Sequence, residues 1–400
     1  METIIIGKPA VNVYLPLQEY PKEGEVFHID NKLESVGNVG ATSACLLAKW
    51  GIKNHFTGVV GNDSYAEKIR NTFQEYKIDT KYMETNFEKG TVVNYMILNS
   101  KSGIVTKVLY NDPLNQLVKY KYDFIPTFAI IDGTDLAGAY ALLNNTANCE
   151  TLFYARFGDR DTITVSKRCT YVVCTQVFAE MMSKETIDGS QESCINMYQH
   201  LVDVAGKSNY IIILNNHKIL YCVDGKVKLV PEMKMNVADY SSFDSIFVGA
   251  LSFALMNKIG LDDAIKFADT AASISLAKVG EVDSIPDVMV VLENSGLKEK
   301  FGVTENVKTN IGPETVEPMK SDVIENNIVT HEESDVNETN ESVNNISNEN
   351  NINTNESIAF NQNIQEESSI VETQNNPQVA EQVNPQPETH ETNIFDDYNV

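Results

Sequence analysis

The chain has 400 residues, with 56 acidic and 31 basic side chains and a formal net charge of −25 at pH 7. A chain this acidic should repel nucleic-acid backbones and anionic lipid surfaces, so we expect no nucleic-acid partner and no membrane partner. The opening METIIIGKPA has neither a basic region nor a long apolar core, and no apolar run reaches the length of a bilayer. The sequence therefore predicts a cytoplasmic protein.

The six cysteines form no C-x-x-C pair, and no histidine cluster stands at metal-ligand spacing. We therefore predict no metal site, and we expect buried free thiols. The cysteines are Cys45, Cys149, Cys169, Cys174, Cys194 and Cys222.

The first 300 residues alternate short β-rich runs with helical patterns, which is typical of βαβ units and a mostly parallel sheet. One predicted helix covers residues 62–76, with Asn62 or Asp63 as its cap, and another covers residues 40–51 and ends at Gly51. The predicted strands lie at residues 3–7, 55–61, 128–133, 151–156, 170–175 and 210–214.

Two regions, residues 11–36 and 91–110, break this alternation. They have the pattern of antiparallel strands, with a turn around Gly103, and predict a small sheet set beside the main one as a lid. The run ILYCVDGKVKLVP predicts a further hairpin, with Asp224 and Gly225 at its turn.

Most of the acidity lies at the C-terminal end, because residues 301–400 hold 20 acids and two bases. This region is rich in Asn, Glu and Ser and poor in aromatic residues, so we predict one α/β domain over residues 1–303 and a disordered tail over residues 304–400. The last eight residues, NIFDDYNV at 393–400, are either a tethered recognition peptide for a protein partner or a chance apolar cluster.

Three segments, GVVGNDSYAEKI, IFVGALSFAL and AASISLAKVGEVDSIP, follow one another in an order that resembles the ribokinase-like (PfkB) sugar kinase family. The resemblance covers roughly residues 3–300, and GKPAVNVYLPLQEYPKEGE fits its N-terminal strand and lid without a gap. It implies a three-layer α/β domain with a small β lid. It further implies ATP-dependent phosphoryl transfer to a sugar-like hydroxyl, with Mg²⁺, and a homodimer formed through the lid.

The family's catalytic motif D-T-x-G-A-G-D falls on DYSSFDS, residues 239–245. In the family, its glycines let backbone N–H groups approach the phosphate and its last Asp is the general base. Here Ser245 stands at the base position and has no basicity near neutral pH, while Asp244 replaces a glycine and would repel phosphate. The residues that the resemblance places on the nucleotide side are Asp239, Ser241 and Ser242, and Asn215 in ILNNHK, which lacks both glycines of the family's T-x-G-x-x-G.

On the substrate side, the family's sugar-binding Asp falls on Asn12, and its G-G-K-G-A-N reads GNVGAT at residues 37–42. Asn12 can still hydrogen-bond a hydroxyl, whereas Val39 cannot. The two glycines either contact a ligand or only permit a tight turn and close helix packing. The substrate-binding candidates are Asn12, Gly37, Asn38, Gly40 and Thr42.

Three functions remain open. The favoured one is a ligand-binding or regulatory protein that keeps the kinase fold while phosphoryl transfer is weak or lost. The second is an active sugar or nucleoside kinase in which a local bulge lets Asp244 serve as general base, although Asp244 could equally be a first-turn acid that favours the helix start. The third is an adaptor that works through the tail.

Overall fold

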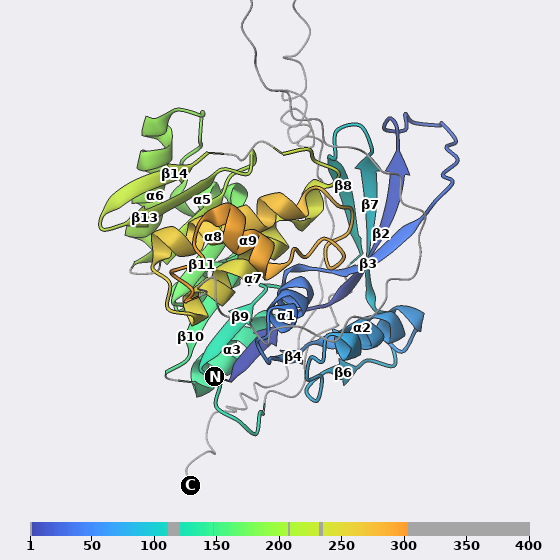
Figure 1. The fold of residues 1–400 in the computed structure, drawn as a ribbon, viewed down its shortest axis with the longest axis horizontal. Helices are drawn as coiled ribbons and strands as arrows, with labels where there is room; N and C mark the ends of the chain where they lie inside the picture. The colour runs from blue at the N-terminus through green and yellow to red at the C-terminus, as the bar shows by residue number, and fades with distance from the viewer. Residues whose placement is uncertain (1, 111–120, 147, 207–208, 232–234, 303–400) are drawn as a thin grey trace, which may run out of the picture. The chain divides into compact units, whose positions relative to one another are not determined.

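The computed structural model describes residues 2–110, 121–146, 148–206, 209–231 and 235–302. The predicted tail from residue 304, including residues 393–400, lies outside the described residues. The described part consists of a large sheet flanked by helices and a smaller sheet beside it (Figure 1).

The large sheet has eight strands in the spatial order β14-β13-β12-β11-β10-β9-β1-β4. The pairs from β4 to β12 are parallel, whereas β12, β13 and β14 pair antiparallel, so the predicted mostly parallel sheet is confirmed. Asp224 and Gly225 both have positive φ, as the predicted tight turn between the last two strands requires. The strands are β1 (Thr3–Ile6), β4 (His55–Thr57), β9 (Phe128–Ile131), β10 (Glu150–Ala155), β11 (Tyr171–Thr175), β12 (Asn209–Ile213), β13 (Ile219–Val223) and β14 (Lys226–Val230).

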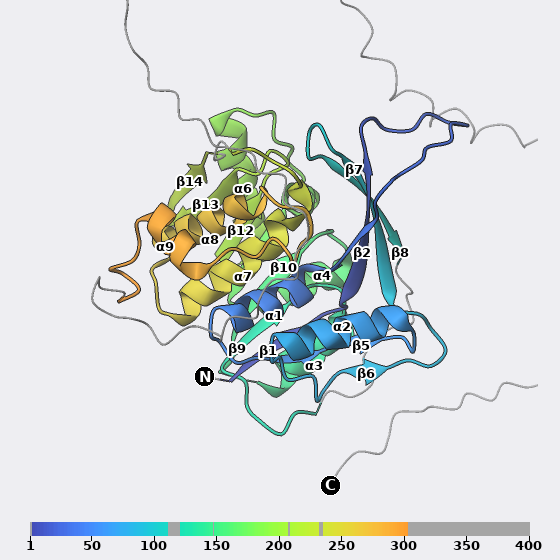
Figure 2. The ribbon, with the colours of Figure 1, turned by 45° about the vertical axis from the view of Figure 1, so that its right-hand side comes forward.

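The second sheet, here called the lid sheet, has the order β3-β2-β7-β8 and stands to one side of the helices (Figure 2). Its two outer pairs are antiparallel, as predicted, but its central pair β2-β7 is parallel. A parallel pair is possible here because several helices and strands lie between β2 and β7 in the sequence. Its strands are β2 (Ala10–Leu17), β3 (Leu33–Gly37), β7 (Val92–Asn99) and β8 (Val105–Tyr110), and a separate short pair joins β5 (Val59–Val60) to β6 (Glu84–Thr85).

Helices cover both faces of the large sheet, because successive strand residues point to opposite faces and both sets are apolar. Ile5, Ile130 and Leu152 pack with α1, α2, α7, α8 and α9, while Ile6 and Phe153 pack with α3 to α6. The helices are α1 (Val39–Lys49), α2 (Ser64–Glu75), α3 (Leu136–Asn145), α4 (Arg160–Ser166), α5 (Gln176–Ser183), α6 (Gln191–Ala205), α7 (Phe243–Met256), α8 (Leu261–Ser275) and α9 (Val288–Ser295), with a short 3₁₀ helix η1 (Tyr240–Ser242) before α7.

Local signals set the helix ends as expected. The Asp63 carboxylate accepts a hydrogen bond from the Ala66 N–H at 2.8 Å and caps α2, and Gly51 has a φ of +86° just after α1. None of the helices in the described residues is long and apolar enough to cross a bilayer. All six cysteines are free thiols; four are buried and two are half-buried.

Candidate functional site

Predicted substrate residues and the start of α7 come together in the structure. The lid sheet and the helices that carry them lie side by side (Figures 1 and 2). Asn12 lies on β2, Thr42 on α1 and Ser245 in the first turn of α7. A fourth side chain, Glu281, comes from the segment after α8 and lies between them. Four separate elements therefore build one site.

The Glu281 carboxylate is the centre of this site. It accepts hydrogen bonds from Asn12 Nδ2 at 2.8 Å, from Thr42 Oγ1 at 3.2 Å and from Ser245 Oγ at 2.6 Å. All four side chains are at most 3% exposed. A buried carboxylate needs such donors to replace water, so these three bonds are what permit an acid at this position. We call these four residues the Glu281 network.

Two further asparagines extend the network toward the start of α1. Asn94 Nδ2, on β7, donates to Asn12 Oδ1 at 2.8 Å and lies 3.0 Å from Asn38 Oδ1. Asn38 Nδ2 in turn donates to the carbonyl of Lys8 at 2.9 Å. Asn38 has a φ of +74°, which is unusual for a residue with a side chain, and these two bonds hold it there.

The two glycines of GNVGAT allow internal side chains to come close. A Cβ at Gly37 would lie 2.2 Å from Asn12 Nδ2, and a Cβ at Gly40 would lie 2.9 Å from the Asp132 carboxylate. Both contacts support the interpretation that these glycines permit close packing. Their contact with a ligand stays a prediction.

Asp239 fixes the loop that carries Glu281. Its carboxylate accepts hydrogen bonds from the N–H and the hydroxyl of Ser241, both at 2.7 Å, and from the N–H of Gly280 at 3.1 Å. The Ser241 hydroxyl also lies 2.8 Å from the Tyr14 hydroxyl. Burial, with the charges of Asp239 and Glu281 as smaller contributions, raises the pKa of Tyr14 well above its usual value, so Tyr14 stays a neutral hydroxyl.

Ser242 and Asp244 have internal partners too. The Ser242 hydroxyl lies 2.9 Å from that of Ser275 on α8, and the Tyr154 hydroxyl donates to Asp244 at 2.5 Å. Asp244 lies in the first turn of α7, which begins at Phe243. This position supports its interpretation as a first-turn acid. Asp244 makes no hydrogen bond to the Glu281 network within the part of the chain that the structure describes.

Asn215 lies apart from these residues. Its N–H donates to Gln176 Oε1 at 3.1 Å, and its side chain is exposed. The neighbouring His217 ring stacks on Tyr240 of η1 at 4.6 Å between centroids, with 5° between the planes, and lies 4.9 Å from the Phe243 ring. An aromatic stack thus joins the loop expected on the nucleotide side to the start of α7.

The start of α7 is where the resemblance implies that a nucleotide phosphate would bind. The Ser241 N–H, which could bind an anion, already donates to Asp239, and the nearby acids include Asp244 and Glu281. Among the described residues, none of these three acids forms an ion pair with a Lys, Arg or His side chain, and no group of three His, Cys, Asp or Glu side chains could hold a metal ion. The start of α7 therefore carries negative charge that would oppose a bound phosphate.

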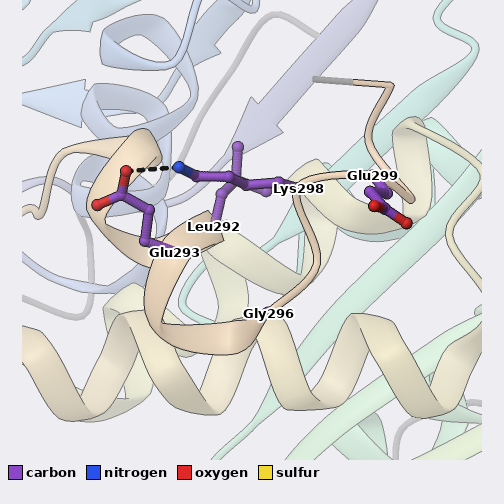
Figure 3. Close-up of a pocket in the computed structure, with 5 residues that line it drawn as sticks. All are labelled: Leu292, Glu293, Gly296, Lys298 and Glu299. Carbon is purple, nitrogen blue, oxygen red and sulfur yellow. Dashed lines mark hydrogen bonds and ion pairs between the residues drawn. The ribbon is translucent and has the colours of Figure 1, made fainter. Parts of the chain in front are cut away.

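A surface pocket lies elsewhere, at the C-terminal end of α9 (Figure 3). It shares no residue with the Glu281 network, and Lys298 beside it is paired with Glu293 at 2.6 Å. Its lining residues are Leu292, Glu293, Gly296, Lys298 and Glu299. We assign it no role.

Comparison with known proteins places the chain in a family. The model of the pfkB family carbohydrate kinases matches residues 11–288. The chain belongs to this family. It is 22% identical to the ribokinase of Haemophilus influenzae over 306 residues, which cover 72% of this chain and 96% of that one. The resemblance inferred from the sequence is therefore confirmed.

Solved structures show the same fold. The ribokinase of Cryptococcus neoformans in complex with ADP has a TM-score of 0.61 at 16% identity, covering 73% of this pfkB-family chain and 98% of the other. The ribokinase of Arabidopsis thaliana complexed with ribose and ATP has a TM-score of 0.58 at 16% identity, with the same coverage. The ribokinase-like α/β fold with a lid is thus confirmed.

Sequence reasoning missed Glu281, Asn94 and Tyr154. Glu281 stands in a segment that matches the family framework, and its only local signal is an acid directly after a glycine in the run LAKVGEVDSIP, which also holds Asp283. Its partners lie at least 36 residues away along the chain. Contacts of this range leave no periodic signal in the sequence.

Proposed function

We propose that this protein is a pfkB-family member in which ATP-dependent phosphoryl transfer to a sugar-like hydroxyl is weak or lost, and that it works as a ligand-binding or regulatory protein. The observation that carries the proposal is the hydrogen bond from Ser245 to Glu281, 2.6 Å long and buried. At the position of the family's general base, this side chain donates a hydrogen bond to a carboxylate and offers no basicity to a substrate.

The surroundings of Ser245 support the same proposal. Phosphoryl transfer depends mainly on positioning and on the stabilisation of charge by N–H groups and cations. Here the start of α7 is lined by Asp239, Asp244 and Glu281, and the donors that could hold a sugar, Asn12 and Thr42, already bond to Glu281. An anionic co-substrate such as ATP would meet negative charge at this place.

The ligand that we propose is sugar-like, because Asn12, Asn38 and Thr42 offer amides and a hydroxyl suited to polyols. The solved relatives support this choice, since one is a ribokinase complexed with ribose and ATP. If phosphoryl transfer survives, we propose ATP as the co-substrate and Mg²⁺ as the metal. A cytoplasmic location and a protein partner for residues 393–400 stay predictions.

We also propose a homodimer formed through the outer face of the lid sheet. Tyr95, Val108 and Tyr110 are 43%, 53% and 60% exposed, and Tyr95 pairs directly with Val108 across the two strands. An apolar face of this kind favours a protein contact. Light scattering after size exclusion should give a molar mass twice that of the chain. Replacing Tyr95 and Val108 by Lys should reduce the molar mass to that of a single chain.

The test of the main proposal is ADP release from ATP and Mg²⁺ with a panel of pentoses, hexoses and nucleosides. We expect the rate of ADP release with each sugar to be close to the rate without sugar. Ser245→Ala should not lower this rate further. Sugar-dependent turnover that Asp244→Ala abolishes would instead establish the active kinase with Asp244 as base. Retained nucleotide affinity, measured by calorimetry, would show that the protein still senses nucleotide.

A further inference from the structure

We propose that the Glu281 side chain is a built-in occupant of the sugar-side site and that it determines which ligands enter. The inference rests on the proposed function, because it takes Asn12 and Thr42 as the sugar contacts. The carboxylate receives donors from β2, α1 and α7, which are the three elements that would surround a bound polyol. Its oxygens thus use the hydrogen bonds that ligand hydroxyls would need.

The loop around Glu281 is held on both sides, so the carboxylate is fixed in the site. The preceding Gly280 donates its N–H to Asp239 at 3.1 Å, and the following Val282 donates its N–H to the Val36 carbonyl at 3.4 Å. Gly280 has a φ of +100°, a conformation that favours glycine, so the chain is shaped to turn Glu281 inward. The side chain itself is 3% exposed.

Entry of a neutral sugar would require Glu281 to leave three hydrogen bonds. A carboxylate displaced within the interior without donors is strongly unfavourable, so the ligand would have to replace those bonds or drive the side chain to water. A sugar phosphate or a sugar acid would in addition meet the charge of Glu281. A neutral polyol that replaces the three bonds can therefore enter the native site only weakly, whereas an anionic sugar is excluded.

Shortening the side chain should open the site. Glu281→Ala removes the carboxylate and leaves Asn12, Thr42 and Ser245 as three buried donors around the vacated volume, which a polyol can satisfy. Glu281→Gln removes the charge but keeps the size, so it should still fill the site. Comparing the two variants separates occupancy from charge.

The experiment is calorimetric titration of the full chain with D-ribose, chosen because a solved relative is complexed with ribose. For Glu281→Ala we expect a Kd for ribose at least about tenfold lower than that of the wild type, whereas Glu281→Gln should bind like the wild type. Asp283→Asn, which changes an exposed acid in the same loop, is the matched control and should bind like the wild type. Glu281→Ser provides the same test if the Ala variant does not fold.

Several outcomes would overturn the inference. Equal ribose affinity for the wild type, Glu281→Ala and Glu281→Ser would show that Glu281 does not occupy the site. If Glu281→Gln gained as much ribose affinity as Glu281→Ala, charge and not occupancy would decide binding. ADP release is measured separately on the same proteins. If the wild type releases no ADP and Glu281→Ala has the ribose affinity of the wild type, only the proposal that Glu281 occupies the site is refuted. Wild-type turnover that Glu281→Gln abolishes would refute both proposals and make Glu281 the proton acceptor.

Discussion

Tyr154 on β10 donates a hydrogen bond to the carboxylate of Asp244 in the first turn of α7, with 2.5 Å between the two oxygens. Burial raises the pKa of Tyr154 well above its usual value, and the charge of Asp244 raises it further, so the hydroxyl remains a donor across the accessible pH range. The bond joins the sheet to α7 and directs Asp244 toward β10. This orientation gives Asp244 a structural role that requires no ligand.

Replacing Tyr154 by Phe should therefore destabilise the protein, because the half-buried Asp244 carboxylate loses its donor. We expect the free energy of unfolding to fall by about 1–3 kcal/mol in urea denaturation. Tyr221→Phe is the matched control, since Tyr221 also donates to a first-turn acid, Asp262, at 2.9 Å. Asp262 keeps two contacts to Lys228, so the loss should be smaller; equal losses would contradict the prediction.

Asp239 should be a principal stabilising acid of the site, because three donors depend on it. Asp239→Ala leaves the N–H groups of Ser241 and Gly280 without this acceptor in the interior, and we expect a loss of roughly 3 kcal/mol or more. Asp287→Ala is the control: Asp287 caps α9 at the surface through one bond to the Met289 N–H, and its loss should be about 1 kcal/mol. Thermal and urea unfolding would both register the difference, and a larger loss for Asp287→Ala would refute it.

Gly37 should not tolerate a side chain. A Cβ there would lie 2.2 Å from Asn12 Nδ2, so Gly37→Ala must displace Asn12 from Glu281 and Asn94, and we expect a loss of about 1–3 kcal/mol. At Gly260, before α8, a Cβ meets no atom within 4 Å and φ is −60°, so Gly260→Ala should stay within about 0.5 kcal/mol of the wild type. Similar unfolding midpoints for the two variants would show that the contact at Gly37 relaxes easily.

Much of the fold could be predicted because its signals are local. The apolar runs that form β1 and β12, the cap Asp63 and the turn at Asp224 and Gly225 each lie within a few residues of the structure that they specify. The parallel pairing of β2 with β7 inside the lid sheet was not predicted, because it joins segments about 80 residues apart. Register across such a distance depends on tertiary packing.

The site was predictable only in part, for the same reason. The family motifs located Asn12, Thr42 and Ser245, and the structure brings these three together. The acid that unites them comes from position 281, and its bond to Asn12 spans 269 residues. The segment around Glu281 matches the family motif, and this match does not predict that the Glu281 side chain points into the site.

Asp269 on α8 should make stability depend on pH. Burial raises its pKa to about 7, whereas an unfolded Asp titrates near 4, so between these values the folded state holds the proton more tightly. The folded state is therefore favoured at low pH, and this contribution is lost as pH rises through about 4 to 7. Asp269→Asn cannot ionise, so it should be more stable than the wild type by an amount that grows with pH, to roughly 2–4 kcal/mol near pH 8.

Urea unfolding at pH 5 and pH 8 measures this difference. Asp203→Asn, which changes an exposed acid near the end of α6, is the control and should show the same small effect at both values. A stabilisation by Asp269→Asn that is equal at the two pH values would indicate packing or hydrogen bonding, and would contradict the titration.

The last prediction concerns the restoration of the family's base. Ser245→Asp would place a second carboxylate beside that of Glu281, whose oxygen lies 2.6 Å from the present hydroxyl. Two buried carboxylates in contact repel strongly, and one of them must take a proton. We therefore expect Ser245→Asp alone to lower the free energy of unfolding by about 2 kcal/mol or more at pH 7.5, with a smaller loss at pH 5, where protonation relieves the repulsion.

Combining Ser245→Asp with Glu281→Ala removes that repulsion. The double variant should be more stable than the sum of the two single effects predicts, with a coupling energy of about 1–3 kcal/mol in a double-mutant cycle. Ser245→Asp with Asp283→Asn is the matched control, because Asp283 is exposed and should show no coupling. Additive effects in the first cycle would mean that the side chain at position 245 turns away from Glu281, and that the Glu281 network does not govern the start of α7.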